Sequence, residues 1–80
     1  MLNANNLRTV RQFLDLYQSQ LADMIGVDRS YIAHIEGGYK PFTASLQART
    51  MHALKLTHDK VTAIVAAQQA YEDARQALVN

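Results

Sequence analysis

Histidine is the side chain best suited to metal binding or to proton transfer near neutral pH. The chain has three, His34, His52 and His58, separated by 18 and 6 residues. Zinc ligands usually occur in closely spaced pairs, and no pair of carboxylates lies near these histidines to complete a site. We therefore expect no metal ion. We place His52 on the polar face of a helix and His58 in a loop.

Other residue patterns that support catalysis are also missing from the sequence. Gly37-Gly38 is not followed by the lysine-serine pair that a phosphate-binding loop needs. Glu72 and Asp73 are adjacent on an expected helix and need not face each other. Serine, histidine and aspartate all occur, but we expect no strand–turn–helix that would position a nucleophile. The expectation is a protein without enzymatic activity, catalytic residues or a cofactor.

The composition is that of a small globular protein. Apolar residues make up 49% and charged residues 19% of 80 residues, which is typical of one domain with a single core. There is no cysteine, and hence no disulfide framework. No apolar run is long enough to span a membrane, and the first ten residues lack the apolar core of a signal peptide. We expect a cytoplasmic location, in a bacterial or phage-infected cell.

The stretch from Gln18 to Gly38 has the layout of two short helices joined by a tight turn. The first helix is expected over Gln18 to Ile25, where Gly26 breaks it, and the second starts after Asp28 and ends at Gly37-Gly38. The apolar residues that would interdigitate between the two helices are Leu21, Ala22, Ile25, Val27, Ile32 and Ile35. This layout is that of a helix-turn-helix, whose second helix can enter a DNA major groove.

Apolar periodicity predicts three further helices around this stretch, so the fold class is all-α. One runs from about Leu7 to Leu16 and begins at a cap provided by Asn5 or Asn6. Its expected apolar face consists of Leu7, Val10, Phe13, Leu14 and Tyr17. Another starts at Thr43 or Ser45 and runs to about Leu54, with Leu46, Met51 and Leu54 in the core. The last spans about Asp59 to Leu78, with Thr57 as its cap. Residues 1–80 would then form a single domain, with a core over 7–56 and a C-terminal helix over 59–78.

The C-terminal helix carries an apolar seam that consists of Ile64, Ala67, Tyr71, Ala74 and Leu78. Its first half is expected to pack on the domain, and its second half to extend beyond it. An apolar seam that is longer than its own core needs a partner, so we expect these five residues to form a homodimer interface. The alternative is that the last two turns fold back or fray, because Gln68, Gln69 and the alanines weaken the seam.

The residues that define these elements also form a family pattern: Leu7, Arg8, Arg11, Gln18, Leu21-Ala22, Ile25-Gly26-Val27, Arg29-Ser30, Ile32, Ile35-Glu36 and Gly38. In this pattern residues 7–38 closely resemble the Cro and phage-repressor (XRE) family of helix-turn-helix regulators, and residues 39–56 resemble it loosely. The resemblance implies a five-helix, lambda-repressor-like domain. Asp15 departs from the pattern, since the family often has glycine there, and Arg49 and Thr50 replace more apolar residues.

The resemblance also implies an ion pair between Arg11 and Glu36. If partly buried, this pair would fix the geometry of the domain, and breaking it would be costly. The alternative is a solvated pair worth less than about 1 kcal/mol.

The resemblance further implies that the second helix of the motif faces DNA. The expected DNA-binding set is Gln18, Asp28, Arg29, Ser30, Tyr31, Ala33, His34, Tyr39 and Lys40. Gln18 would contact a phosphate, and Arg29 would read guanine or bind a phosphate. Tyr31 would either contact the DNA backbone or pack under the following loop. Ser30, Ala33 and His34 would face base edges, and Tyr39 and Lys40 would grip the backbone. Asp28 lies beside this surface and is interpreted as a helix cap, because a free carboxylate there would repel phosphate.

The predicted function is sequence-specific regulation of transcription, most simply by a repressor that binds a two-half-site operator as a homodimer. The net charge is only +1, so we expect DNA binding with a shallow salt dependence for each subunit. The shortage of cations also supports a second hypothesis. In it the domain is a protein-interaction module or antitoxin-type protein, whose C-terminal helix binds a toxin or another regulator.

Overall fold

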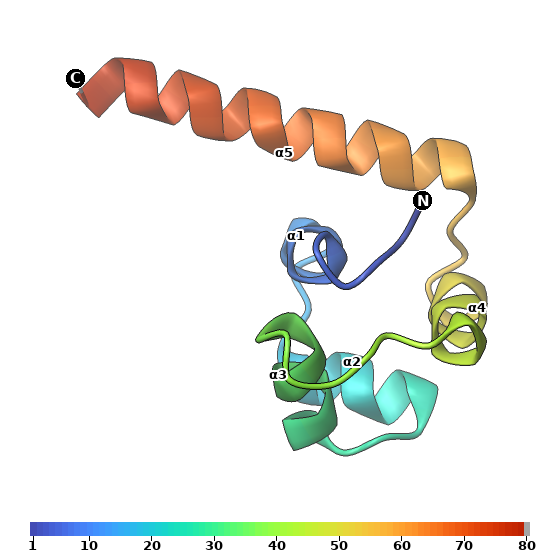
Figure 1. The fold of residues 1–80 in the computed structure, drawn as a ribbon. Coiled ribbons are helices and arrows are strands. Elements are labelled where there is room, and N and C mark those ends of the chain that lie inside the picture. Colours follow the sequence, from blue (N-terminus) through green and yellow to red (C-terminus); the bar gives the residue numbers. More distant parts are fainter. Residues whose placement is uncertain (80) are drawn as a thin grey trace.

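The computed structural model describes residues 1–79, which form five helices and no strand (Figure 1). The helices are α1 (Leu7–Phe13), α2 (Gln18–Ile25), α3 (Arg29–Glu36), α4 (Ala44–Ala53) and α5 (His58–Val79). The expected all-α class is thus confirmed for this part of the chain. Within the same residues, none of the helices combines the length and the apolar character needed to cross a bilayer.

The four short helices all have the same type of C-terminal end. In each case an amide donates to the carbonyl oxygen five residues earlier: Leu16 to Arg11, Val27 to Ala22, Tyr39 to His34, and Leu56 to Met51, at 2.8 to 3.1 Å. The residue before each of these donors has a left-handed backbone, with φ of 57° at Asp15, 73° at Gly26, 83° at Gly38 and 54° at Lys55. This is the Schellman arrangement, in which glycine is usual and a polar residue is tolerated.

These helix ends correct the expected end of the first helix and agree with the expected end of the motif's second helix at Gly37-Gly38. Helix α1 ends at Phe13 and not near Leu16, because the left-handed Asp15 terminates it without a glycine in the sequence. In the Gly37-Gly38 pair, only Gly38 adopts the left-handed conformation, and Gly37 remains helical with φ of −82°.

The N-terminal caps agree with expectation in two helices and differ in two. Thr43 accepts the amide of Leu46 at the start of α4, and Thr57 accepts the amide of Lys60 at the start of α5, both at 3.2 Å. Asn6 makes no cap because its Oδ1 accepts the amide of Asn3. The interpretation of Asp28 as a side-chain cap is also wrong. Its backbone carbonyl accepts the amide of Tyr31 instead, and the carboxylate remains exposed.

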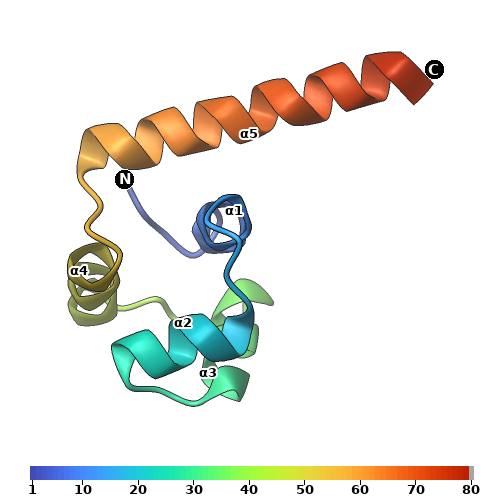
Figure 2. The same cartoon turned by 180° about the vertical axis from the view of Figure 1, so that it is seen from behind.

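The four short helices pack together, and the long helix α5 lies against α1. Helix α2 packs against α3 and α4, and α1 packs against α5. Both views show α5 on one side of the domain and the α2–α3 pair on the other, with α1 between them (Figures 1 and 2). The C-terminal half of α5 extends past α1, which contributes to a long dimension of 40 Å against 25 and 19 Å for the other two.

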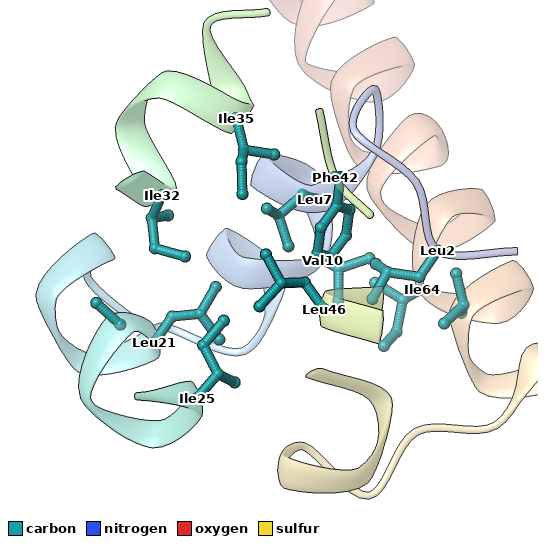
Figure 3. Close-up of a cluster of buried hydrophobic side chains, with 12 residues drawn as sticks. Leu2, Leu7, Val10, Leu21, Ile25, Ile32, Ile35, Phe42, Leu46 and Ile64 are labelled. Atoms are coloured by element: carbon teal, nitrogen blue, oxygen red, sulfur yellow. The ribbon is translucent and has the colours of Figure 1, made fainter. Parts of the chain in front are cut away.

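Side chains from every helix meet in the core (Figure 3). The buried apolar residues are Leu2, Leu7, Val10, Leu21, Ala22, Ile25, Ile32, Ile35, Phe42, Leu46, Val61 and Ile64. Leu2 lies outside the expected core and is fully buried. Phe13 and Tyr17 are 44% and 75% exposed, so their assignment to the buried face of the first helix is wrong. Phe13 is the last residue of α1 and Tyr17 precedes α2, so neither is held on the inner face of a helix.

The second half of α5 has no cover within the domain. Val61 and Ile64 are buried and Val65 is half-buried, whereas every residue from Gln69 to Val79 is exposed. The alternative in which the last turns fold back is therefore wrong for these residues. The expectation that His58 lies in a loop is also wrong, since it is the first residue of α5.

We predict that Leu2→Ala lowers the free energy of unfolding by about 2–5 kcal/mol, because it leaves a cavity where a fully buried leucine sits. Urea titration followed by circular dichroism measures the change. Met24→Ala, at a site 47% exposed on α2, is the control and should cost less than about 1 kcal/mol. Equal effects of the two substitutions would contradict the packing of the N-terminal segment.

Candidate nucleic-acid interface

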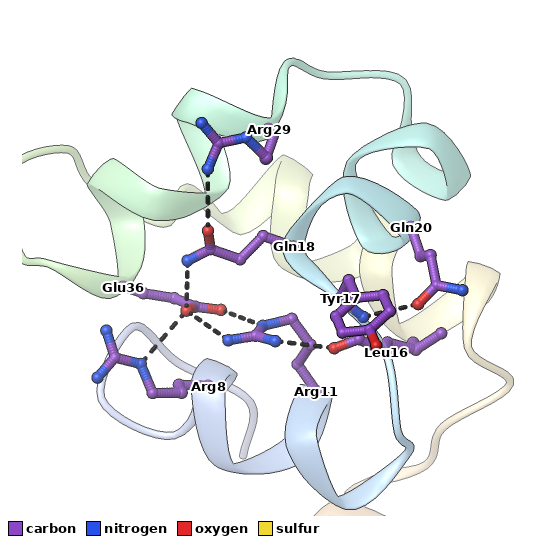
Figure 4. A network of polar contacts seen from close by, with 8 residues as sticks. All are labelled: Arg8, Arg11, Leu16, Tyr17, Gln18, Gln20, Arg29 and Glu36. Carbon is purple, nitrogen blue, oxygen red and sulfur yellow. Dashed lines mark hydrogen bonds and ion pairs between the residues drawn. The ribbon is translucent and has the colours of Figure 1, made fainter.

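The carboxylate of Glu36, the last residue of α3, is completely buried and carries the Arg11 pair that the resemblance implies. Arg11 donates from Nε to Oε2 at 2.7 Å and from Nη2 to Oε1 at 3.0 Å (Figure 4). This is a two-point, fork-to-fork contact, which fixes orientation as well as charge. The solvated alternative does not apply, because the side chain of Arg11 is only 9% exposed.

Three further donors complete this polar cluster. Gln18 Nε2 donates to Glu36 Oε1 at 3.1 Å, and Arg8 Nε approaches the same oxygen at 3.4 Å. Arg11 Nη1 donates to the carbonyl oxygen of Leu16 at 2.8 Å. The cluster thereby joins α1, the α1–α2 connection, α2 and α3. Among the described residues, no buried side-chain nitrogen or oxygen lacks a partner.

Two opposing effects act on the pKa of Glu36. Burial raises the pKa, because it disfavours the charged form. The hydrogen bonds from Arg11 and Gln18, the charge of Arg11 and the bond from Arg8 lower it, and together they outweigh burial. The net pKa therefore lies below the ordinary glutamate value of 4.5, and the group is ionised at neutral pH.

Gln18 links this buried cluster to the start of α3. Its Nε2 is bound to Glu36, so its Oε1 faces the other way and accepts from Arg29 Nη1 at 3.5 Å (Figure 4). The structure therefore places the side chain of Gln18 between two protein groups. The phosphate contact expected of Gln18 stays a prediction. The arrangement places Gln18 Oε1 at the limit of hydrogen-bonding distance from the exposed Arg29 guanidinium.

One face of α3 is open to solvent. Arg29, Ser30 and His34 are exposed, and Ala33 is half-buried. At about 100° per residue these four lie within an arc of roughly 140°. Ile32 and Ile35 lie fully buried on the opposite side of the helix. The structure therefore brings together the four α3 residues that were expected to face base edges.

The loop after α3 returns over the same helix. The amides of Tyr39 and Lys40 both donate to the carbonyl oxygen of His34, at 2.8 and 3.2 Å. The Tyr39 ring lies edge-on to His34 at 6.4 Å, and the Lys40 ammonium is 5.5 Å from the centre of the Tyr31 ring. Tyr31 is half-buried against the core, and its expected contact with the DNA backbone stays a prediction. Tyr39 and Lys40 are exposed beside the open face of α3.

Charge on this surface is limited. Arg29 and Lys40 are its exposed cations. Asp28, whose carboxylate makes no helix cap, lies directly before Arg29 and is also exposed. Arg49, one of the departures from the family pattern, donates from Nη1 to the carbonyl oxygen of Ile25 at 2.9 Å. It therefore closes the C-terminal end of α2, as a cation at a helix C-terminus is expected to do. A carbonyl acceptor leaves no mark in the sequence, so this role could not be predicted.

Comparisons with protein-family models, with curated proteins and with solved structures return no match for this chain. Within residues 1–79, no three histidine, aspartate or glutamate side chains are grouped so that they could hold a metal ion.

We predict that Arg11→Ala lowers the free energy of unfolding by about 3 kcal/mol, because it leaves the buried Glu36 carboxylate without its main partner. For a domain of this size that loss lowers Tm by roughly 12 °C or more. Arg8→Ala is the matched control: it approaches the same carboxylate but is 58% exposed, and it should cost less than about 1 kcal/mol. An unchanged Tm in Arg11→Ala would overturn the structural role of the pair.

The lowered pKa of Glu36 predicts a pH dependence of stability. Above 4.5 the carboxylate is ionised in both the folded and the unfolded chain, and its stabilising contribution is complete. As the pH falls from 4.5 through the lower folded pKa, the unfolded chain binds the proton first and the contribution is lost. Glu36→Gln should be less stable at pH 7 and should lose less stability than the wild type in this acid range. Urea titrations at several pH values test this, with Glu72→Gln on the exposed part of α5 as control.

Proposed function

We propose that α2 and α3 form a helix-turn-helix and that the protein is a sequence-specific DNA-binding regulator of transcription, acting as a repressor. The observation that carries the proposal is the open face of α3, where Arg29, Ser30 and His34 are exposed above a buried apolar side. Arginine suits guanine, since its guanidinium can donate to O6 and N7 together, and serine or histidine can bond a base or a phosphate. The proposed domain is lambda-repressor-like.

The polar cluster supports this proposal because it places a hydrogen-bond acceptor beside the proposed base-reading side chain. Gln18 bonds Glu36, and its Oε1 lies 3.5 Å from Arg29 Nη1, a contact that favours one position of the guanidinium. A side chain oriented before binding loses less conformational entropy in the complex. Tyr39 and Lys40 lie at the edge of the same face, where they would meet the sugar-phosphate backbone.

The proposed operator has two half-sites and is bound by a homodimer. A two-fold dimer would place its two α3 helices in successive major grooves, about 34–36 Å apart or a multiple of this spacing. Each subunit brings two exposed cations to the DNA, Arg29 and Lys40, so we expect a slope of log K against log salt no steeper than about −2 per subunit. Contacts from the backbone amides at the start of α2 add affinity without adding to this slope.

A protein-interaction module is the second candidate function. It is favoured by the same shortage of cations, since Arg11 and Arg49 are used within the fold and Asp28 opposes a phosphate backbone. In this candidate the exposed part of α5 would bind a toxin or another regulator, as a helix lying in a groove of its partner.

Selection of bound sequences from a random pool of double-stranded DNA tests the proposal. We expect enrichment of a symmetric site, for which the double variant Arg29→Ala/His34→Ala loses affinity by about tenfold or more. Asp28→Asn is the control of opposite sign: it removes a charge that repels phosphate and should tighten binding. An unenriched pool contradicts DNA recognition. The interaction module would be favoured if the double variant binds as the wild type does, while loss of residues 66–80 abolishes partner binding.

A further inference from the structure

A groove of about 510 Å³ lies between the end of α1, the α4–α5 connection and the first half of α5. Its lining is mainly apolar and includes Phe13, Leu14, Leu54, Leu56, Ile64 and Ala67. The charged side chains at the groove, Lys55 and Lys60, are both cationic and both exposed. Phe13 is 44% exposed here, at the end of α1. The groove is thus an apolar surface that the domain itself does not cover.

The apolar face of α5 continues from this groove to the end of the helix. Lys60, Ile64 and Ala67 line the groove, and Tyr71, Ala74 and Leu78 follow on the same face at alternating separations of four and three residues. Tyr71 is 59% and Leu78 is 87% exposed. A single face of one helix therefore contributes both to a groove and to an apolar segment of suitable width to occupy such a groove.

The chain exposes more surface than a compact monomer of its mass, as expected if a partner covers part of it. A compact monomer of 9.0 kDa is expected to expose about 4,850 Å², whereas this chain exposes 5368 Å². The projecting end of α5 accounts for exposed surface of this kind, and a helix end without tertiary contacts is only marginally stable in water. Small residues lie along one edge of the seam, namely Ala63, Ala67, Ala70, Ala74 and Ala77. They would let a second helix approach closely.

We propose that the cover is a second copy of this chain, with the two α5 helices antiparallel and each Tyr71–Leu78 end seated in the other protomer's groove. The seam is symmetric under reversal: position 60 pairs with 78, 64 with 74, and 67 with 71. Antiparallel pairing therefore uses the same patch twice, as a two-fold interface requires. It also places Lys60 beside the partner's Leu78, where its aliphatic stem can pack while the ammonium stays in water. Parallel pairing would instead bring two Lys60 side chains together and leave both grooves empty.

This interface and the open face of α3 do not compete. Helix α5 lies on the side of the domain away from the α2–α3 pair (Figures 1 and 2), so both α3 faces remain open in the dimer. The proposal extends the homodimer of the proposed function by naming its partner surface, and it does not require DNA to be present.

Cross-linking tests the arrangement directly, because the chain contains no cysteine. Lys60→Cys and Leu78→Cys are both substitutions of exposed residues on α5. An equal mixture of the two single variants, oxidised without DNA, should form a disulfide-linked heterodimer. Thr62→Cys mixed with Leu78→Cys is the control, since position 62 is exposed on another face of α5 and should not cross-link. If disulfides formed only between two Leu78→Cys chains, the helices would be parallel and the proposal would be overturned.

Sedimentation equilibrium without DNA gives a second measurement. Leu78→Asp should weaken dimerisation by about tenfold or more, because an exposed apolar anchor is lost. Gln76→Asp adds the same charge on a different face of the same turn and should dimerise as the wild type does. A monomeric wild-type protein overturns the dimer. Failure of DNA selection together with successful cross-linking would instead reject only the proposed function.

Discussion

The charge of Glu36 is buried, and the side chains that compensate it join α1, α2 and α3. A buried carboxylate is tolerated only where donors surround it, and here Arg11, Gln18 and Arg8 come from two different helices. Arg11 also bonds the Leu16 carbonyl, so the connection between α1 and α2 is held by the same guanidinium. The pair therefore connects α1, the α1–α2 connection and α3, and losing Arg11 would leave a buried charge without its main partner.

Short helices need the same kind of support at their ends. The four helices from α1 to α4 have 7 to 10 residues, a length at which helices are not stable alone in water. Each ends in a left-handed residue that satisfies terminal carbonyls and redirects the chain toward the core. Arg49 adds a bond from α4 to the end of α2, so that side chains and helix ends together complete the hydrogen bonding of the domain.

Because two arginines make hydrogen bonds within the fold, few cations are left beside the open face of α3. Arg11 and Arg49 are committed to the fold, which leaves Arg29 and Lys40 as the cations beside the open face of α3. The proposed DNA contact must then depend on hydrogen-bond geometry more than on total charge. On the other side of the domain, the first half of α5 packs on the core, and its second half exposes the apolar residues Tyr71 and Leu78. The proposed recognition face is therefore polar and lies on α3, whereas the proposed dimer face is apolar and lies on α5.

By itself the sequence determined the five helices, because apolar periodicity and the glycines after α2 and α3 are local signals. It also indicated the Arg11–Glu36 pair, through a family resemblance. The end of α1 could not be predicted, since Asp15 adopts a left-handed conformation that is usually signalled by glycine. Nor could the burial of Leu2, the exposure of Phe13 or the bond from Arg49 to Ile25 be predicted. These features depend on which surfaces meet when the helices pack, and only the tertiary structure brings residues distant in sequence into contact.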